Sequence, residues 1–466
     1  MFRLKFTHLL KQYTLTHHHS SKCIIYRSLI TKSEVKMSSN KDQPLDLSNF
    51  VSQRVANLQD DVWSIFSKVS AQFQTINLGQ GFMGFPAPDF VKKALVEATM
   101  NDINQYAPVR GLPRLCNALS NNYSPLFKRQ LDPNTNILIT TGANEGIFSV
   151  FAAFIKDGDE AIFIEPYFDQ YKPNLEMNGG VPIYCPLRKD ESISFSSKLS
   201  SSVWKLDIAE MESKITSKTK IIVLNTPYNP VGKIFTEEEL LSIGKVAEKH
   251  NLIILSDEVY DRLYFAPATH TRIAALKNFW RRTITVGSAG KSFGVTGWRV
   301  GWLIGPENLI KYVMGAHCRI CFCTSSTMQD AVANAFEQSE TNGFFETQIQ
   351  EYDERRKYLM DSFDDIGLSY VIPDGAYFIL VNTEKIHPSA ESWEDCPDFI
   401  KERGFNYQMC YWLAKNIGVT AIPCSEFYSA DNSSIADSLI RFAFCKPIEV
   451  LKQAVERMQK LKPLIQ

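Results

Sequence analysis

The sequence predicts an α/β fold in which helices cover a mainly parallel β-sheet. Five short apolar runs, each ended by a polar or glycine-rich turn, are typical of buried strands. These runs are Ile137–Thr140, Glu160–Ile164, Ile221–Leu224, Leu252–Leu255 and Thr283–Val286. Helix-like stretches such as Gly146–Phe154 and Glu237–Lys249 lie between them. This alternation favours parallel strands, and ligands of such sheets bind beyond the carboxyl ends of the strands.

Length and charge narrow the class of protein further. The chain has 466 residues, of which 44% are hydrophobic and 22% charged, an ordinary globular balance. Domains usually have about 100–200 residues, so the length predicts two or three lobes. The formal net charge of −1 argues against nucleic acid or an anionic membrane as a partner. Small molecules are therefore the expected partners. No apolar run reaches the roughly 18–20 residues of a membrane span.

Residues 1–36 differ in composition from the rest of the chain. They are basic, contain several serine and threonine residues, and have Glu34 as their first acidic residue. This composition is typical of a mitochondrial transit peptide, and the alternative is a disordered basic arm without a targeting role. We therefore expect a mitochondrial protein, and a second start at Met37 would add a cytoplasmic form.

The ten cysteines are scattered, and without a secretory signal they are expected to be free thiols in a reducing compartment. Their one cluster is Cys318, Cys321 and Cys323, directly after His317. A Cys-x-x-Cys pair can hold zinc or cycle between thiol and disulfide, but no second pair lies at the spacing of a zinc site. We therefore predict no metal site and expect these cysteines to be small buried residues.

Residues that could bind an anion follow two of the predicted strands directly. Thr140–Gly146 combines a strand end, a glycine turn and a helix start, where free N–H groups favour a phosphate. The rigid loop Asn225–Gly232 presents Asn229, whose amide can donate to an oxygen anion. Either segment taken alone is also a common turn.

Asp257 and Tyr260 follow the next strand, in the segment Ser256–Tyr260. A carboxylate at the end of a buried strand is unfavourable unless it meets a cation, and a protonated pyridine nitrogen would be such a cation. Tyr260 could hydrogen-bond a phenolate oxygen. The alternative for Asp257 is a helix N-cap.

Lys291 lies in the loop Gly287–Phe293, after the last of these strands. The loop is not a P-loop of the G-x-x-x-x-G-K-[ST] type, because Thr285 stands where the first glycine would be. Lys291 lies beside hydroxyl groups and is followed by Arg299 between two glycines. This combination suits a Schiff base to a cofactor and a clamp for its phosphate.

In this order and spacing, the motifs resemble those of fold-type-I pyridoxal-phosphate aminotransferases. They are TGANEG, EPYFDQY, NTPYNPVGK, SDEVY, GSAGKSFGVTGWRVGW and RFAFCK, and the resemblance extends from about Trp63 to the C-terminus. The segment Leu78–Phe82 (LGQGF) resembles the kynurenine aminotransferase and glutamine transaminase K group, some of whose members are cysteine-S-conjugate β-lyases. The resemblance implies a large domain at residues 89–336 and a smaller α+β domain formed by residues 37–88 and 337–466.

The resemblance assigns catalytic and cofactor-binding roles to the residues after the strands. Lys291 would carry pyridoxal phosphate and then shuttle the proton between the substrate Cα and the C4′ carbon of the cofactor. Asp257 would pair with the pyridinium nitrogen, and Phe168 would stack on the ring. Tyr260 and Asn229 would hold the phenolic oxygen. The remaining cofactor contacts are Asn144 and the phosphate-binding residues Gly142, Ala143, Ser288 and Arg299.

The same resemblance implies a substrate site. Arg441 would bind the substrate α-carboxylate through a two-pronged salt bridge, for which lysine is a poor substitute. Gly81 would let the backbone approach the substrate closely, and Asn229 would face the substrate as well as the cofactor. Trp63 would line the pocket, with core packing as the alternative.

The family is expected to work as a homodimer. A tyrosine of one subunit reaches the cofactor phosphate of the other, and Tyr106 matches that residue. Where relatives have an aromatic residue followed by histidine, this chain has Cys321-Phe322. Both residues are therefore candidates for substrate specificity.

The expected reaction is ping-pong transamination from an amino acid to a 2-oxo acid. Kynurenine, glutamine and aromatic or sulfur amino acids are the expected donors, and kynurenine would yield kynurenic acid. The alternative enzyme activity is β-elimination on cysteine S-conjugates by the same residues. A non-catalytic regulator with this fold is a remote alternative, because the chain has no room for an added helix-turn-helix module.

Overall fold

The computed structural model describes residues 45–47, 49–52, 54–56, 58, 61–190, 192–195 and 198–466. Ser52–Gln466 form one unit, and every element discussed below belongs to it. The predicted leader at residues 1–36 and the second start at Met37 lie outside the described residues.

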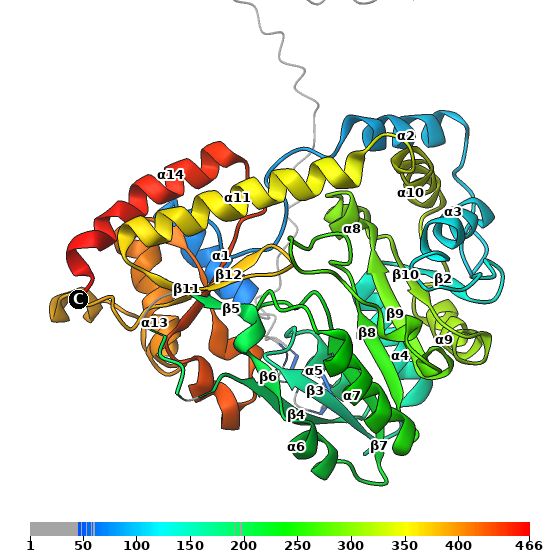
Figure 1. The fold of residues 1–466 in the computed structure, drawn as a ribbon, viewed down its shortest axis with the longest axis horizontal. Coiled ribbons are helices and arrows are strands. Elements are labelled where there is room, and N and C mark those ends of the chain that lie inside the picture. The colour runs from blue at the N-terminus through cyan, green and yellow to red at the C-terminus, as the bar shows by residue number, and fades with distance from the viewer. Residues whose placement is uncertain are drawn as a thin grey trace, which may run out of the picture. The chain divides into compact units, whose positions relative to one another are not determined.

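An eight-stranded sheet forms the centre of this unit (Figure 1). Its strands are β2 (Ile137–Thr140), β3 (Glu160–Glu165), β4 (Val181–Arg188), β6 (Lys205–Leu206), β7 (Thr219–Asn225), β8 (Ile253–Asp257), β9 (Thr283–Ser288) and β10 (Gly301–Ile304). The order is β2-β10-β9-β8-β7-β3-β4-β6, and β9, β8, β7, β3 and β4 run parallel. Because β10 is antiparallel to both β2 and β9, β2 shares the direction of the parallel strands. The five predicted strands are confirmed as β2, β3, β7, β8 and β9.

Helices cover this sheet and extend from its β2 edge. They are α2 (Asp89–Met100), α3 (Pro113–Tyr123), α4 (Ala143–Phe154), α5 (Tyr171–Met177), α6 (Ile208–Ser213), α7 (Glu237–Lys249), α8 (Ala289–Ser292), α9 (Glu307–Ile320) and α10 (Ser326–Ser339). Figure 1 shows α4 and α7 on opposite sides of β8 and β9. The helix predicted at Glu237–Lys249 is confirmed, and it begins with a capping box in which Thr236 and Glu239 satisfy each other's backbone N–H groups.

A second sheet of five strands has the order β14-β15-β12-β11-β5. Its strands are β5 (Leu199–Ser200), β11 (Ser369–Ile372), β12 (Phe378–Asn382), β14 (Ile422–Pro423) and β15 (Leu439–Ala443), and β1 (Ile76–Asn77) pairs separately with β13 (Val419–Thr420). The helices of this part are α1 (Val62–Phe73), α11 (Phe344–Ile366), α12 (Asp398–Lys401), α13 (Phe405–Trp412) and α14 (Ile448–Met458). In Figure 1 the long helix α11 runs from near α10 to the second sheet. The lobe boundaries at residues 88 and 336 stay a prediction.

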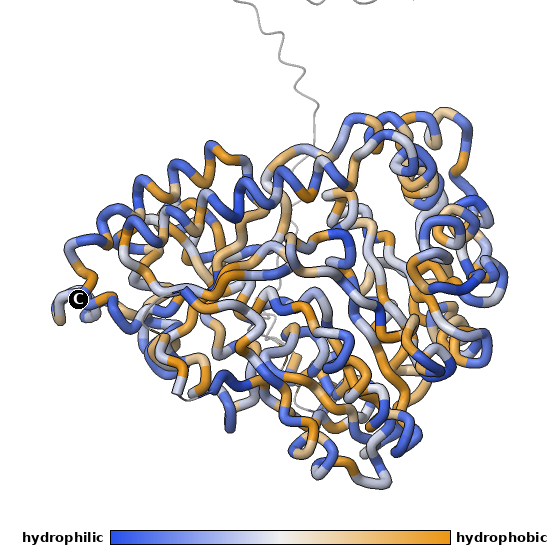
Figure 2. Tube along the Cα trace, viewed as in Figure 1, coloured by the Kyte–Doolittle hydropathy of each residue, from blue (hydrophilic) through white to orange (hydrophobic). Residues whose placement is uncertain are grey.

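The burial of the strands follows their sequence. Every residue of β2, β9 and β10 is buried, as expected of strands covered on both faces. Figure 2 shows the hydrophobic residues gathered along the strands of the large sheet, while the surrounding helices alternate between hydrophobic and hydrophilic residues. Within the described residues, no helix combines the length and apolar character needed to cross a bilayer.

Candidate active site

Four strands with a common direction end at one edge of the eight-stranded sheet. β2 ends at Thr140, β7 at Asn225, β8 at Asp257 and β9 at Ser288. Gly301, the first residue of β10, pairs in register with both Thr140 and Ser288. The predicted functional segments therefore meet at one place, although they lie far apart in the sequence.

Two cavities at this edge share Phe168, Asn229, Tyr260 and Lys291 as lining residues. The smaller cavity, about 190 Å³, is also lined by Ala143, Asn144, Asp257, Ser288 and Arg299. The larger, about 750 Å³, is also lined by Trp63, Gly81, Phe378 and Arg441. Nine of the eleven residues predicted to bind the cofactor thus line the smaller cavity, whereas Gly142 and Tyr106 do not. All four residues predicted to bind the substrate line the larger cavity.

Lys291 lies on the short helix α8, directly after β9, and faces both cavities. Its Nζ donates to the Tyr377 hydroxyl at 2.7 Å and to the Gly81 carbonyl at 3.1 Å. Removal from bulk water lowers the pKa of Lys291 to about 8, because burial disfavours the charged form. Such a lysine has a larger neutral fraction near pH 7 than an ordinary lysine, which suits covalent attachment and proton transfer.

Asp257 is a buried carboxylate at the smaller cavity. The Tyr171 hydroxyl donates to its Oδ2 at 2.5 Å, and the Val259 N–H donates to its Oδ1 at 3.3 Å. Burial raises the pKa of Asp257 to about 6, and the hydrogen bond from Tyr171 opposes this rise. In the described part of the chain no cation forms an ion pair with Asp257. Turns rather than a helix follow the strand, so the helix N-cap alternative is wrong.

Replacing Asp257 with asparagine is expected to stabilise the cofactor-free protein at pH 7.5 while impairing catalysis. The raised pKa of about 6 means that stability is lost as the pH rises from about 3.8 to 6, as the buried group ionises. The cost of about 2 pKa units is at most roughly 3 kcal/mol. Asparagine does not ionise, so the melting temperature of the Asp257→Asn variant should exceed that of the wild type at pH 7.5. The difference between the two proteins should shrink at pH 4. A lower melting temperature at pH 7.5 would contradict this account.

The start of α4 has the features of a phosphate site. Gly142 is the N-cap residue with φ +84°, and no side chain caps the helix. A Cβ atom at Gly142 would lie 2.3 Å from Nη2 of Arg299, so the guanidinium rests against the start of the helix. Arg299 donates to the Thr296 carbonyl at 2.9 Å and has no acidic partner among the described residues. Open helix N–H groups beside a guanidinium that has no acidic partner among the described residues favour a dianionic phosphate.

Replacing Gly142 with alanine is expected to weaken pyridoxal-phosphate binding by about 100-fold, because the new Cβ displaces Arg299 from the phosphate site. Gly158 offers a matched control, since its φ is +82° and a Cβ there would meet nothing within 4 Å. Both variants should lose about 1 kcal/mol of folding stability through backbone strain. Only Gly142→Ala should also raise the dissociation constant of the cofactor, measured by titrating the cofactor-free protein. Equal cofactor affinities in the two variants would refute the phosphate assignment.

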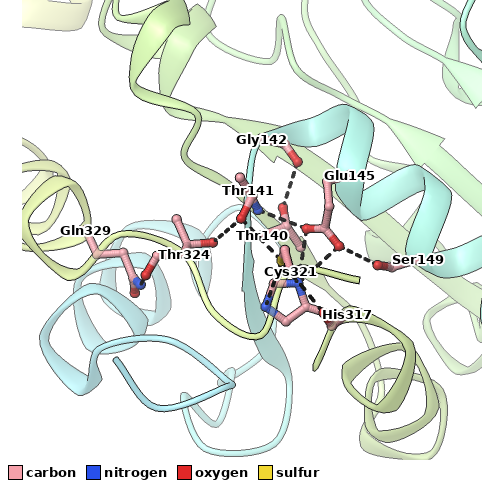
Figure 3. A network of polar contacts seen from close by, with 9 residues as sticks. All are labelled: Thr140, Thr141, Gly142, Glu145, Ser149, His317, Cys321, Thr324 and Gln329. Carbon is pink, nitrogen blue, oxygen red and sulfur yellow. Dashed lines mark hydrogen bonds and ion pairs between the residues drawn. The ribbon is translucent and has the colours of Figure 1, made fainter. Parts of the chain in front are cut away.

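A hydrogen-bond network braces the start of α4 from the side of α9 (Figure 3). Glu145 accepts the Thr141 N–H at 2.9 Å and the Ser149 hydroxyl at 2.5 Å, and it lies 3.0 Å from Nδ1 of His317. Sγ of Cys321 lies 3.3 Å from the same Nδ1 and 3.4 Å from the Thr141 hydroxyl. Glu145, His317 and Cys321 are all of metal-ligand types, and each already has hydrogen-bond partners within this network.

The prediction that the clustered cysteines are buried is wrong, because Cys318, Cys321 and Cys323 are all partly exposed. Cys318 lies on α9, which ends at Ile320, whereas Cys321 and Cys323 lie in the turn that follows the helix. Phe322 has φ +66°, is 50% exposed and packs edge-on against the ring of Tyr106. Neither Cys321 nor Phe322 lines the two cavities, and their role in specificity stays a prediction.

Arg441 lies on β15 and is only 1% exposed. Its Nη1 donates to Oδ1 of Asn229 at 2.8 Å, and its Nη2 donates to the Gly79 carbonyl at 2.9 Å. Its Nε has no hydrogen-bond partner among the described residues. Burial lowers the pKa of Arg441, because the charged guanidinium has lost its water. A buried guanidinium of this kind, at the wall of a cavity, is suited to bind a carboxylate.

Trp63 combines both of its predicted roles. It lies on α1, packs against the hydrophobic core and lines the larger cavity. Its Nε1 donates to Oδ2 of Asp169 at 2.8 Å, and the guanidinium of Arg441 lies 5.2 Å from its ring centroid. The indole is therefore held in one orientation beside the carboxylate-binding arginine.

Four site residues were not anticipated. Asn225 and Tyr171 lie inside the quoted motifs, where the resemblance assigned them no role. Tyr377 contacts Lys291, and Phe378 lies under the guanidinium of Arg441 at 4.1 Å from the ring centroid. Both belong to a segment joined to the site only by the tertiary fold, so nothing in the local sequence distinguishes them.

The residues present fit pyridoxal phosphate. A lysine with a lowered pKa, a buried carboxylate without a cation and an anion site at a helix start all face one cavity. When bound there, the cofactor would be held by Lys291, Asp257 and Arg299, and it would supply an electron sink. The site and fold therefore define a fold-type-I pyridoxal-phosphate enzyme.

Comparison with known proteins gives the family. Residues 74–458 match the model of the aminotransferase class I and II family. A probable kynurenine–oxoglutarate transaminase of Saccharomyces cerevisiae is 41% identical, with 87% of this chain and 93% of that protein covered. The human kynurenine–oxoglutarate transaminase 3 is 37% identical, with 87% and 88% covered. The crystal structure of Bna3p from Saccharomyces cerevisiae superposes with a TM-score of 0.86 at 41% identity, covering 89% of this chain and 99% of that one. The chain belongs to the class I and II aminotransferases, and it is a transaminase that uses pyridoxal phosphate.

Proposed function

We propose that this transaminase takes the amino group of L-kynurenine and related amino acids and passes it to a 2-oxo acid. The observation that supports this best is the surroundings of Arg441. The rings of Trp63 and Phe378 lie 5.2 and 4.1 Å from its guanidinium, and both residues line the larger cavity. Phe82, Phe168 and Tyr260 line the same cavity, so the space beside the expected carboxylate site has aromatic walls. Such walls favour a donor with an aromatic or sulfur-containing side chain. The names of the similar proteins, kynurenine–oxoglutarate transaminases, agree with this choice.

The chain's residues divide the work as follows. Arg441 binds the substrate α-carboxylate, and its bond to Asn229 keeps the two side chains in a fixed relation. Lys291 in its neutral form takes the proton from the substrate Cα and later returns it. With the cofactor bound, the carboxylate of Asp257 would hold a proton at the ring nitrogen, which would keep the ring electron-poor.

The first test is the absorption spectrum of the purified protein with bound pyridoxal phosphate. L-Kynurenine is added without any 2-oxo acid. Conversion of the band of lysine-bound cofactor to that of the pyridoxamine form is the expected result. An unchanged band would retain the family and reject kynurenine as a donor. Pyruvate release from a cysteine S-conjugate, faster than this half-reaction, would make β-elimination the main activity.

We propose a homodimer whose sites are completed across the interface. Tyr106 is 83% exposed, lines neither cavity of its own chain and packs on the half-exposed Phe322. A partner subunit would give these rings a contact. The test is to mix inactive Lys291→Ala and Tyr106→Ala proteins. If Tyr106 serves the other subunit, a hybrid dimer has one intact site and activity returns, whereas a Tyr106 that serves its own chain gives no recovery.

We also propose that the protein is imported into mitochondria, on the composition of residues 1–36. Full-length and Met37-initiated forms, each fused to a fluorescent protein, are compared in cells. Mitochondrial signal that depends on residues 1–36 supports the proposal, and a wholly cytosolic full-length form rejects it.

A further inference from the structure

Among the described residues, the Tyr377 hydroxyl is the closest hydrogen-bond partner of the Lys291 amine. The Tyr377 hydroxyl accepts from Nζ of Lys291 at 2.7 Å and donates to the Gly81 carbonyl at 2.7 Å. Nζ also donates directly to the same carbonyl at 3.1 Å. Amine, hydroxyl and carbonyl therefore form a closed triangle at the wall of the larger cavity.

The hydroxyl is held rigidly by the rings around it. Tyr377 is fully buried and stacks on Tyr352, with ring centroids 6.1 Å apart and planes 20° apart. Tyr260 meets it edge-on at 5.1 Å. A Cβ atom at Gly81 would lie 3.2 Å from the Tyr377 ring and 2.8 Å from the Phe378 ring, so the carbonyl of Gly81 is equally constrained.

This triangle fixes the direction of the free amine. A neutral lysine amine has two N–H bonds and one lone pair. Tyr377 and Gly81 each take one N–H, which leaves the lone pair as the only unused position on Nζ. When the α C–H bond of the substrate breaks, its proton goes to that lone pair, and its electron pair stays on the substrate.

We propose that Tyr377 is a positioning residue for proton transfer by Lys291. Its hydroxyl holds the amine, once the amine is released from the cofactor, with the lone pair directed away from Tyr377 and Gly81. The proposal rests on the proposed role of Lys291 as the cofactor lysine. It assigns to Tyr377 no contact with the substrate and no share in substrate affinity.

The test compares Tyr377→Phe with the matched control Tyr352→Phe. Each variant loses one buried hydroxyl from adjacent stacked rings, but the Tyr352 hydroxyl has no hydrogen-bond partner among the described residues. Tyr377→Phe should lower kcat about 10- to 100-fold, because a misdirected base loses much of its effect. The KM for L-kynurenine should change less than about twofold, since the Arg441 site is untouched. Tyr352→Phe should leave both constants at wild-type values.

Two further readouts separate positioning from general damage. With kynurenine deuterated at Cα, the primary isotope effect should rise in Tyr377→Phe, because proton transfer becomes slower than the other steps. The isotope effect is a ratio of two rates of the same enzyme, so it does not depend on the amount of folded protein. In the cofactor-free protein, competitive acetylation measures the pKa of Lys291. Loss of an acceptor for the ammonium form should lower that pKa in Tyr377→Phe and leave it unchanged in Tyr352→Phe.

The outcomes separate the role of Tyr377 from the assignment of Lys291 as the cofactor lysine. Borohydride reduction of the wild-type holoenzyme, followed by peptide mapping, identifies the lysine that carries the cofactor. A label on another lysine overturns the role of Lys291, and the proposal with it. A label on Lys291, together with equal kcat, isotope effect and lysine pKa in the two tyrosine variants, overturns the role of Tyr377 alone.

Discussion

Replacing Lys291 with alanine is expected to abolish transamination while the fold remains intact. Alanine removes both the point of covalent attachment and the base that moves the Cα proton, so kcat should fall by at least about 10⁴-fold. Lys291 lies at the wall of two cavities rather than in the packed core, which is why the fold should survive its loss. Steady-state turnover with L-kynurenine or glutamine as donor measures the effect.

The control for this prediction is Lys311→Ala, which removes an exposed lysine from α9. Its turnover should equal that of the wild type, and circular dichroism should be the same for all three proteins. Full turnover by Lys291→Ala would falsify the central assignment of the site. A loss of turnover accompanied by unfolding would instead show that Lys291 has a structural role, contrary to its position.

Replacing Arg441 with alanine is expected to raise the KM of every α-amino acid alike. The α-carboxylate is common to all donors, and a lost charge-assisted bond in a buried site costs about 2–4 kcal/mol, or about 30- to 1,000-fold in kcat/KM. Arg441→Lys should recover only part of this loss, because an ammonium group cannot form the two-pronged contact. The measurement is kcat/KM for three donors with different side chains.

The comparison between donors is the control within this experiment. A loss confined to one donor would show that Arg441 recognises a side chain instead of the α-carboxylate. Asn229 accepts a hydrogen bond from Arg441, so the loss of Arg441 could also displace Asn229. Such a displacement would lower kcat in addition to raising KM. Cofactor affinity should change little, since Arg441 does not line the smaller cavity.

The sequence was sufficient to predict the site residues that directly follow strands. Asp257, Lys291 and Asn229 each lie where an apolar run gives way to polar residues, and parallel strands bring such positions to one edge. The strand β10 was not anticipated, because its residues lie in the segment interpreted as the phosphate clamp. β4 was not anticipated either, since Pro182 and Pro186 are unusual inside a strand.

The rest of the site depends on contacts that no local pattern encodes. Tyr377 lies 86 residues beyond Lys291 in the sequence, and only the tertiary fold brings its hydroxyl to the lysine amine. The partial exposure of Cys321 follows from where α9 ends, which a helical pattern locates only within a few residues. The network around Glu145 likewise joins α4 to the end of α9, two elements with no shared motif.

The distribution of the cofactor residues over separate strands links cofactor supply to the lifetime of the protein. Asn225, Asp257 and Ser288 line the smaller cavity and end three strands of one continuous sheet, so unfolding any of these strands destroys the binding site. A ligand that binds only the folded state stabilises it, by about 4 kcal/mol when present at 1,000 times its dissociation constant. In cells where the cofactor is scarce, more of the chains would unfold transiently and reach the proteases that degrade open chains. The abundance of this enzyme, as well as its specific activity, should therefore rise and fall with the vitamin from which the cofactor is made.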